Sequence, residues 1–127
     1  MIWTIEYIEK QNYLKITREG KFGIAEHLNM FEEILLTEPF RPGMPLFFDN
    51  RDLEFGKVDF PTMHRAAGNY QKMSEKIGHG KAVMLMRKTS LDFGYGRQFQ
   101  VLCQSRGLLE FGVFTDEEVA LKWLLRI

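Results

Sequence analysis

The sequence has few of the features that mark secreted, membrane-spanning or nucleic-acid-binding proteins. It has one cysteine, Cys103, which cannot form an internal disulfide. Its N-terminus lacks a secretory signal pattern, and no apolar run approaches the roughly 20 residues of a membrane-spanning helix. The 17 basic and 17 acidic residues cancel, so no global field attracts nucleic acid. We therefore expect a cytoplasmic protein with no nucleic-acid partner and no transmembrane segment.

Motifs of known catalytic and metal sites are also missing. None of the histidines, His27, His64 and His79, has a second histidine or cysteine at metal-ligand spacing, so we expect them to be solvated or to cap helices. No serine lies in a Gly-x-Ser-x-Gly elbow. Cys103 falls on the apolar side of a predicted helix and is expected in the core. We predict no metal and no cofactor; an enzyme is not excluded, but a non-enzymatic protein is favoured.

What the chain does contain is enough apolar sequence for one packed core. With 127 residues, 45% of them hydrophobic, we expect a single domain over residues 1–127. Ile2 to Ile8 and Tyr13 to Thr17 alternate apolar and polar residues across a short polar link, which predicts an antiparallel hairpin. The unalternating runs through Leu46–Phe48 and Ala82–Met86 predict strands buried on both faces.

Helical spacing separates these strands. The predicted helices run from Ile24 to Leu35, from Pro61 to Ile77, from Ser90, as N-cap, to Gly107, and from a capping box of Thr115 and Glu118 to the C-terminus, with a strand over 109–114 before the last. Alternation of this kind predicts an α/β fold with a mostly parallel five-stranded sheet and four main helices. The residues expected to point inward from the helices are Ile24, Leu28, Phe31, Leu35, Met63, Ala66, Ala67, Tyr70, Met73, Ile77, Leu91, Tyr95, Phe99, Leu102, Cys103, Val119, Ala120, Trp123, Leu124 and Ile127.

Two predicted loops at the carboxyl edge of the sheet form the candidate site, because ligands gather at that edge in parallel sheets. Gly94 and Gly96 in a helix's opening turns suggest close approach of the backbone to a ligand or to another strand, and the nearby basic side chains suit an anion. Tight packing with solvated charges explains the same residues. The candidate residues are Asp49, Asn50, Arg51, Asp52, Arg87, Lys88, Ser90, Gly94, Gly96 and Arg97.

Methionine and phenylalanine residues suggest a second kind of site. An adaptable apolar pocket would use Met63, Met73, Met84, Met86, Phe47 and Phe48, although core packing explains them equally well.

Three segments carry a resemblance to a known family. Phe48-Asp49-Asn50-Arg51, Gly94-Tyr95-Gly96-Arg97-Gln98-Phe99 and the ending Val113 to Leu124 are similar to SpoIIAA-like proteins of the STAS superfamily, the domain of sulfate transporters and anti-sigma-factor antagonists. The resemblance covers nearly the whole chain. It implies a β-α superhelix that is generally used for binding rather than catalysis, in a branch that is largely uncharacterised.

The resemblance does not extend to the phosphorylated serine of anti-sigma-factor antagonists. The corresponding stretch, Asp49 to Gly56, has no serine or threonine. Thr62, at the start of the next helix, is an alternative phosphosite, since a phosphate there would favour the helix dipole. A capping or exposed threonine is the simpler interpretation.

The main hypothesis is a non-enzymatic binding or regulatory module that engages a protein partner or a small ligand at the carboxyl edge of the sheet. The alternative is an enzyme or carrier that acts on a small anionic or apolar, lipid-like molecule. A homodimer formed through an exposed apolar helix face is a third hypothesis.

Overall fold

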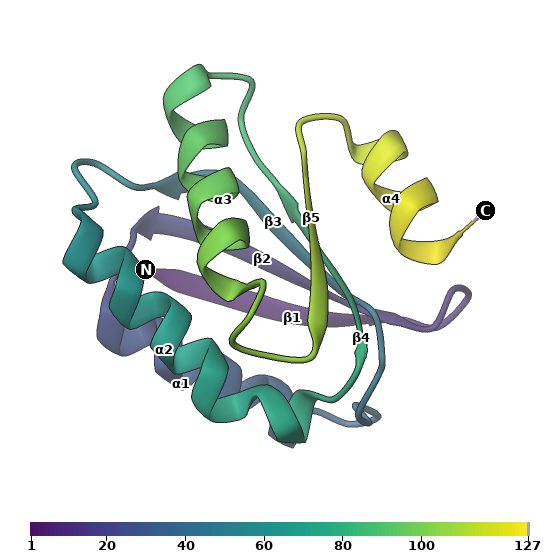
Figure 1. Ribbon diagram of the computed structural model, residues 1–127. Coiled ribbons are helices and arrows are strands. Elements are labelled where there is room, and N and C mark those ends of the chain that lie inside the picture. The colour runs from purple at the N-terminus through teal and green to yellow at the C-terminus, as the bar shows by residue number, and fades with distance from the viewer. Residues whose placement is uncertain (127) are drawn as a thin grey trace.

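The computed structural model describes residues 1–126, which form a five-stranded sheet with helices on both faces (Figure 1). The strands lie in chain order; β1 and β2 are antiparallel and all other neighbours are parallel. The strands are β1 (Ile2–Ile8), β2 (Tyr13–Lys21), β3 (Leu46–Glu54), β4 (Gly80–Leu85) and β5 (Leu109–Phe114). The helices are α1 (Ile24–Leu36), α2 (Phe60–Ile77), α3 (Ser90–Cys103) and α4 (Glu117–Leu125). The predicted α/β class, hairpin and four helices are confirmed.

One face of the sheet packs against α1, α2 and α3 and holds the main core. Pleating turns alternate residues of each strand toward this face, and the strands contribute Leu14, Ile16, Leu46, Phe48, Ala82, Met84, Phe111 and Val113. Phe31 of α1 and Tyr70 of α2 are fully buried against them. The same alternation continues past the apolar runs and carries Arg18 of β2 and Asn50 of β3 under the helices.

The opposite face is only partly covered, by α4. Phe47, Val83 and Leu85 pack there against Ala120 and Leu124 of α4. The helix packs mainly on β4 and β5, and Tyr13 and Lys15 of β2 reach its edge.

The strands β2 and β3 are longer than the sequence predicted. Asp49–Asp52, expected in a loop, belong to β3, because the two strands continue to pair beyond the end of β4: Glu19 lies opposite Asp52, and Lys21 opposite Glu54. Pairing satisfies the backbone N–H and C=O groups whatever the polarity of the side chains. The prediction of a loop, which was based on the polarity of this segment, was therefore wrong.

The predicted ends of α3 and α4 need correction. Thr89, not Ser90, is the N-cap of α3, since its Oγ1 accepts from the Asp92 backbone N–H at 3.2 Å. Asp116, not Thr115, caps α4 by accepting from the Val119 N–H at 3.0 Å. In addition, α3 ends at Cys103 rather than Gly107.

Several side chains that were expected to point inward do not. Leu91 and Val119 are 62% and 51% exposed, because each lies within a turn of its helix N-terminus, beyond the edge of the sheet. On α1 the fully buried residues are His27, Met30, Phe31 and Ile34, so the buried face is rotated from the predicted one. Ile127 lies outside the described residues.

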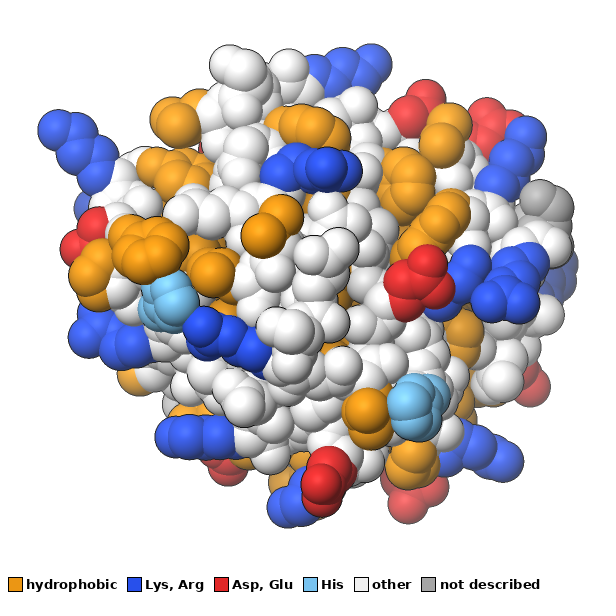
Figure 2. Space-filling view, viewed as in Figure 1, with side chains coloured by type: hydrophobic (Ala, Val, Ile, Leu, Met, Phe, Trp, Pro, Cys, Tyr) orange, Lys and Arg blue, Asp and Glu red, His pale blue; other side chains and the backbone are white. Residues whose placement is uncertain are grey.

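The surface mixes both signs of charge. Figure 2 shows basic and acidic side chains scattered over one face, with hydrophobic side chains exposed in small groups between them. Among residues 1–126, no helix is long and apolar enough to cross a bilayer. In the same range, no three His, Cys, Asp or Glu side chains gather as a metal site would require.

Candidate functional site

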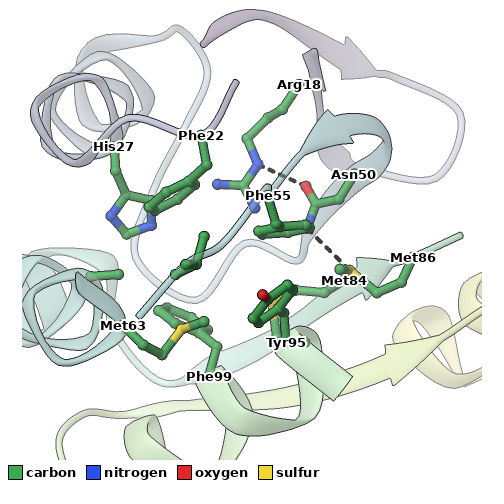
Figure 3. Close-up of a pocket in the computed structure, with 13 residues that line it drawn as sticks. Arg18, Phe22, His27, Asn50, Phe55, Met63, Met84, Met86, Tyr95 and Phe99 are labelled. Carbon is green, nitrogen blue, oxygen red and sulfur yellow. Dashed lines mark hydrogen bonds between the residues drawn. The ribbon is translucent and has the colours of Figure 1, made fainter. Parts of the chain in front are cut away.

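A pocket lies between the carboxyl ends of β2, β3 and β4 and the three helices that cover them (Figure 3). Apolar side chains line most of it, and two polar side chains from the sheet, Arg18 and Asn50, form one wall. The lining residues are Arg18, Phe22, His27, Asn50, Phe55, Val58, Met63, Ala66, Met84, Met86, Tyr95, Gly96 and Phe99. Its volume of about 30 Å³ is enough for about two water molecules.

Arg18 is the unusual residue of this pocket. Its side chain extends from β2 into the core and is only 5% exposed, yet no Asp or Glu among residues 1–126 forms an ion pair with it. Burial lowers the pKa of Arg18 to about 9, so the guanidinium still carries its charge at pH 7. Buried charges in proteins are normally paired; here a full positive charge lies in an apolar setting without an anion.

The contacts of Arg18 compensate for this burial only in part. Its Nε donates to Asn50 Oδ1 at 2.7 Å, its Nη1 lies 3.9 Å from the Met30 sulfur, and its Cζ lies 5.3 Å from the ring centre of Phe48. These hydrogen bonds leave Nη2 without an acceptor. No enclosed side-chain nitrogen or oxygen among residues 1–126 lacks a partner, so Nη2 is not sealed inside the core. Figure 3 shows the Arg18 guanidinium directed into the pocket.

Asn50 orients Arg18 and is itself held from the other side. Its Nδ2 donates toward the Met86 sulfur at 3.4 Å, while its Oδ1 accepts from Arg18. The carbonyl oxygen must face the guanidinium and the amide nitrogen the sulfur, because only the oxygen can accept. The one acceptor that Asn50 presents to the pocket is therefore in use.

His27, from α1, adds a second donor. It is 3% exposed, and burial together with the charge of Arg18 lowers its pKa to about 3, so the imidazole is neutral at pH 7. Its Nδ1 lies 3.3 Å from Asn69 Nδ2, which can only donate. The ring proton is therefore on Nε2. The expectation of a solvated or capping histidine was wrong for this residue.

Aromatic side chains close the pocket on its outer side. Phe22 stacks on Phe55 with ring centres 6.0 Å apart, and Phe55 lies 5.3 Å from Tyr95. The Tyr95 hydroxyl donates to the Gly56 carbonyl at 3.1 Å, which ties α3 to the segment between β3 and α2. Gly56 has a φ of +58°, in the left-handed region that favours glycine. We refer to Phe22, Phe55, Gly56 and Tyr95 as the roof.

The predicted edge residues on β3 are divided between the two faces. Asn50 points into the pocket, whereas Asp49 and Arg51 lie on the α4 face. There Arg51 binds Asp49 with two side-chain hydrogen bonds, at 3.0 and 2.8 Å, and approaches Glu117 of α4 at 3.7 Å. The bond to Arg51 holds the pKa of Asp49 below its usual value, against the opposing effect of burial. Asp52 is exposed.

The second predicted segment is similarly divided. Arg87 is held by Asp92 Oδ2 at 2.9 Å and by the Leu53 carbonyl at 2.9 Å. Gly96 lines the pocket and lets α3 approach the sheet, since a Cβ there would lie 2.9 Å from Val113 and 3.1 Å from Met86. Around Gly94 a Cβ would meet nothing within 4 Å. Lys88, Ser90 and Arg97 are exposed to solvent, and so is Arg87 despite these bonds.

Other residues considered from the sequence lie elsewhere. Thr62 is half-buried in the first turn of α2, where its N–H donates to the N-cap Asp59 and its Oγ1 accepts from Arg65. Cys103 is fully buried, and burial raises the pKa of its thiol to about 12. Among the expected apolar lining residues, Met63, Met84 and Met86 are in the pocket, and Phe47 is on the opposite face.

Arg18 was not singled out from the sequence, although a signal for it exists. Leu14, Ile16 and Arg18 occupy alternate positions, so a strand that buries the first two also turns the third toward the core. Ending the strand at Thr17 hid this. His27 could also have been found, because it lies one helical turn before Phe31, a residue that was predicted to point inward from α1.

Comparison with known proteins agrees with this fold. No protein-family model matches the chain, and no curated protein matches it in sequence. Its structure is similar to the crystal structure of an uncharacterised DUF3478-family protein with a SpoIIAA-like fold from Shewanella loihica PV-4. The TM-score is 0.60 at 17% identity, over 97% of this chain and 92% of the other. The chain therefore has a SpoIIAA-like fold, as its resemblance to STAS domains implied.

Proposed function

We propose that this protein is a non-enzymatic binding module that takes up a small molecule in the pocket between β2, β3, β4 and the helices α1–α3. The observation that carries the proposal is the buried guanidinium of Arg18, which faces the pocket and forms no ion pair with an Asp or Glu in the described range 1–126. Such an arrangement is costly for folding, by several kcal/mol for an uncompensated ion. Strain of this kind is typical of sites that await a ligand.

Binding suits the pocket better than catalysis. His27, the residue that would act as a general base, has a pKa of about 3, and its unprotonated Nδ1 already accepts from Asn69. The Tyr95 hydroxyl is engaged with the Gly56 carbonyl. The lining residues include no Ser, Thr or Cys side chain that could serve as a nucleophile.

Methionine methyl groups provide a direct test. Met63, Met84 and Met86 line the pocket, while Met44 and Met73 lie outside it. Protein labelled with carbon-13 at the methionine methyls is titrated with a panel of small acids, amides and alcohols. The proposal expects shifts at the three pocket methyls with at least one probe and none at the two controls. If no probe moves the pocket methyls, the pocket is not a binding site.

A protein partner is the second candidate, favoured by exposed side chains beside the pocket. Leu91 is 62% exposed in the first turn of α3, and the side chains of Lys88 and Arg97 on the same segment are exposed to solvent. A partner bound to this surface would contact α3, the helix that also carries Tyr95 of the pocket, so a ligand that moves Tyr95 could change the affinity for the partner. Pull-down with the wild type and with Leu91→Asp tests this: a partner retained by the variant would not be using this surface.

A further inference from the structure

We infer that the ligand of this pocket is a carboxylate with an apolar body. Its two oxygens would lie at Arg18 and its carbons among the phenylalanine and methionine side chains. The inference rests on the proposed function, that the pocket binds a small molecule, and adds the chemical class of that molecule.

The polar groups of the pocket set the sign of the ligand. Arg18 offers its unbonded N–H groups and His27 offers Nε2–H, whereas the Asn50 oxygen is occupied by Arg18 Nε. The polar end of the site, at Arg18 and His27, therefore presents donors and a positive charge, and the acceptor beside them, Asn50 Oδ1, is already bonded to Arg18. A ligand that fits it must supply acceptors and negative charge, since an unpaired buried charge is far more costly than a paired one.

The number of charges selects a carboxylate over a phosphate. The pocket has one cation, and its remaining wall is almost entirely apolar. A phosphate group carries close to two negative charges and more oxygens than these donors can satisfy. A carboxylate has one charge and two oxygens, which match the two-pronged geometry of a guanidinium.

The apolar wall selects the rest of the ligand. Val58, Met63 and Phe99 are among the apolar side chains that line the rest of the pocket. The volume of about 30 Å³ accommodates the carboxylate but not a longer body. An apolar tail must therefore displace the roof, which one hydrogen bond, from Tyr95 to Gly56, ties to α3.

The experiment is a calorimetric and methyl-NMR titration of the full chain with matched acids and amides. The acids are butanoate, hexanoate and octanoate, with 3-phenylpropanoate to separate aliphatic from aromatic bodies; octanamide is the neutral match. Each added methylene that is buried once the roof has moved should tighten binding about fourfold. Octanoate should bind at least tenfold tighter than octanamide, because only the acid neutralises Arg18.

Two arginine variants locate the effect. Arg18→Met should weaken octanoate at least 100-fold and octanamide less than threefold. The matched control Arg51→Met, on the opposite face, should change neither by more than twofold. If Arg18→Met does not fold because Asn50 loses its partner, the double variant Arg18→Met/Asn50→Leu replaces it.

The outcomes separate this inference from the proposed function. If octanamide binds as tightly as octanoate and shifts the same pocket methyl signals, the pocket binds small molecules but does not select carboxylates, and the inference is wrong while the proposed function stands. If Arg18→Met keeps its preference for the acid, Arg18 is not the recognition group and the inference is wrong. If neither acids nor amides move the pocket methyls, the proposed function fails with it.

Discussion

Arg18 and Arg51 lie on neighbouring strands and on opposite faces of the sheet. Both carry a positive charge, but they differ in burial and in whether a carboxylate balances that charge. Arg51 is 45% exposed at its side chain and forms a two-pronged pair with Asp49, a contact found on many protein surfaces. Arg18 is almost completely buried, and of the residues that the structure describes it contacts an amide, a sulfur and an aromatic ring but no paired acid. This difference is the basis for our proposal that the ligand binds on the face of the sheet under α1, α2 and α3, whereas Arg51 and Asp49 on the α4 face form a structural ion pair.

We call the face of the sheet that packs against α1, α2 and α3 the inner face, and the face that packs against α4 the outer face. Acid should lower the free energy of unfolding more through His27 on the inner face than through Asp49 on the outer face. His27 has a pKa near 3 when folded and an ordinary value of 6.5 when unfolded, because burial and Arg18 oppose its charge. Between these values only the unfolded chain binds the proton, so stability is complete above about pH 6.5 and falls by about 1.4 kcal/mol per pH unit below it. At pH 5 the loss is about 2 kcal/mol.

Urea denaturation between pH 5 and 8 measures this effect, with His27→Gln as the control. The variant keeps a polar side chain at this position but cannot titrate, so its curve should lack the His27 slope. Parallel curves for the two proteins would mean that the folded and unfolded chains bind the His27 proton equally well, and that burial beside Arg18 does not lower the pKa of this residue.

The pair on the outer face should contribute a smaller amount. Asp49→Asn removes the charge of the carboxylate but keeps its shape, and Arg51→Met removes the other partner. Each should cost about 1 kcal/mol, because the pair is partly exposed and screened by solvent. The pKa of Asp49 is lowered, so this contribution is present above its ordinary pKa of 3.8 and is lost as the pH falls through its folded value. Urea denaturation at pH 7 in 0.05 and 0.5 M salt measures it; a cost above 3 kcal/mol would contradict the solvent-screened description.

The smallest effect concerns the roof. Tyr95→Phe removes one partly solvated hydrogen bond to Gly56 and should lower stability by less than about 1 kcal/mol. Hydrogen exchange at residues 55–59 should accelerate, and octanoate should associate faster. Unchanged exchange in this segment would show that the hydrogen bond does not hold the pocket closed.

The sequence predicted the fold far better than the pocket, for physical reasons. Apolar periodicity records burial, so the strands at Leu46 and Ala82 and all four helices were found. The same rule fails where a strand continues into polar residues, as at Asp49–Asp52, because backbone pairing does not depend on side-chain polarity. In a pleated strand, successive residues point to opposite faces, so Asn50 and Arg51 lie on different sides of the sheet. The prediction of a loop could not separate them in this way.

Arg18 shows the same limit at a single residue. Its position follows from the alternation of Leu14 and Ile16, but the absence of an acidic partner depends on what three helices bring above it. A charged residue in a strand is usually solvated, so a pattern alone favours the wrong interpretation. Only the packed structure shows a charge without a partner.

The most direct test of this account is the stability of the unliganded Arg18→Met/Asn50→Leu variant against the wild type in urea at pH 7. Replacing an uncompensated buried charge and the amide that orients it with apolar side chains of similar size should stabilise the protein by about 1 to 3 kcal/mol. Such a gain would mean that the buried charge of Arg18 lowers the stability of the unliganded protein, as the account requires. A loss of similar size would show that Arg18 stabilises the core, and would contradict the account.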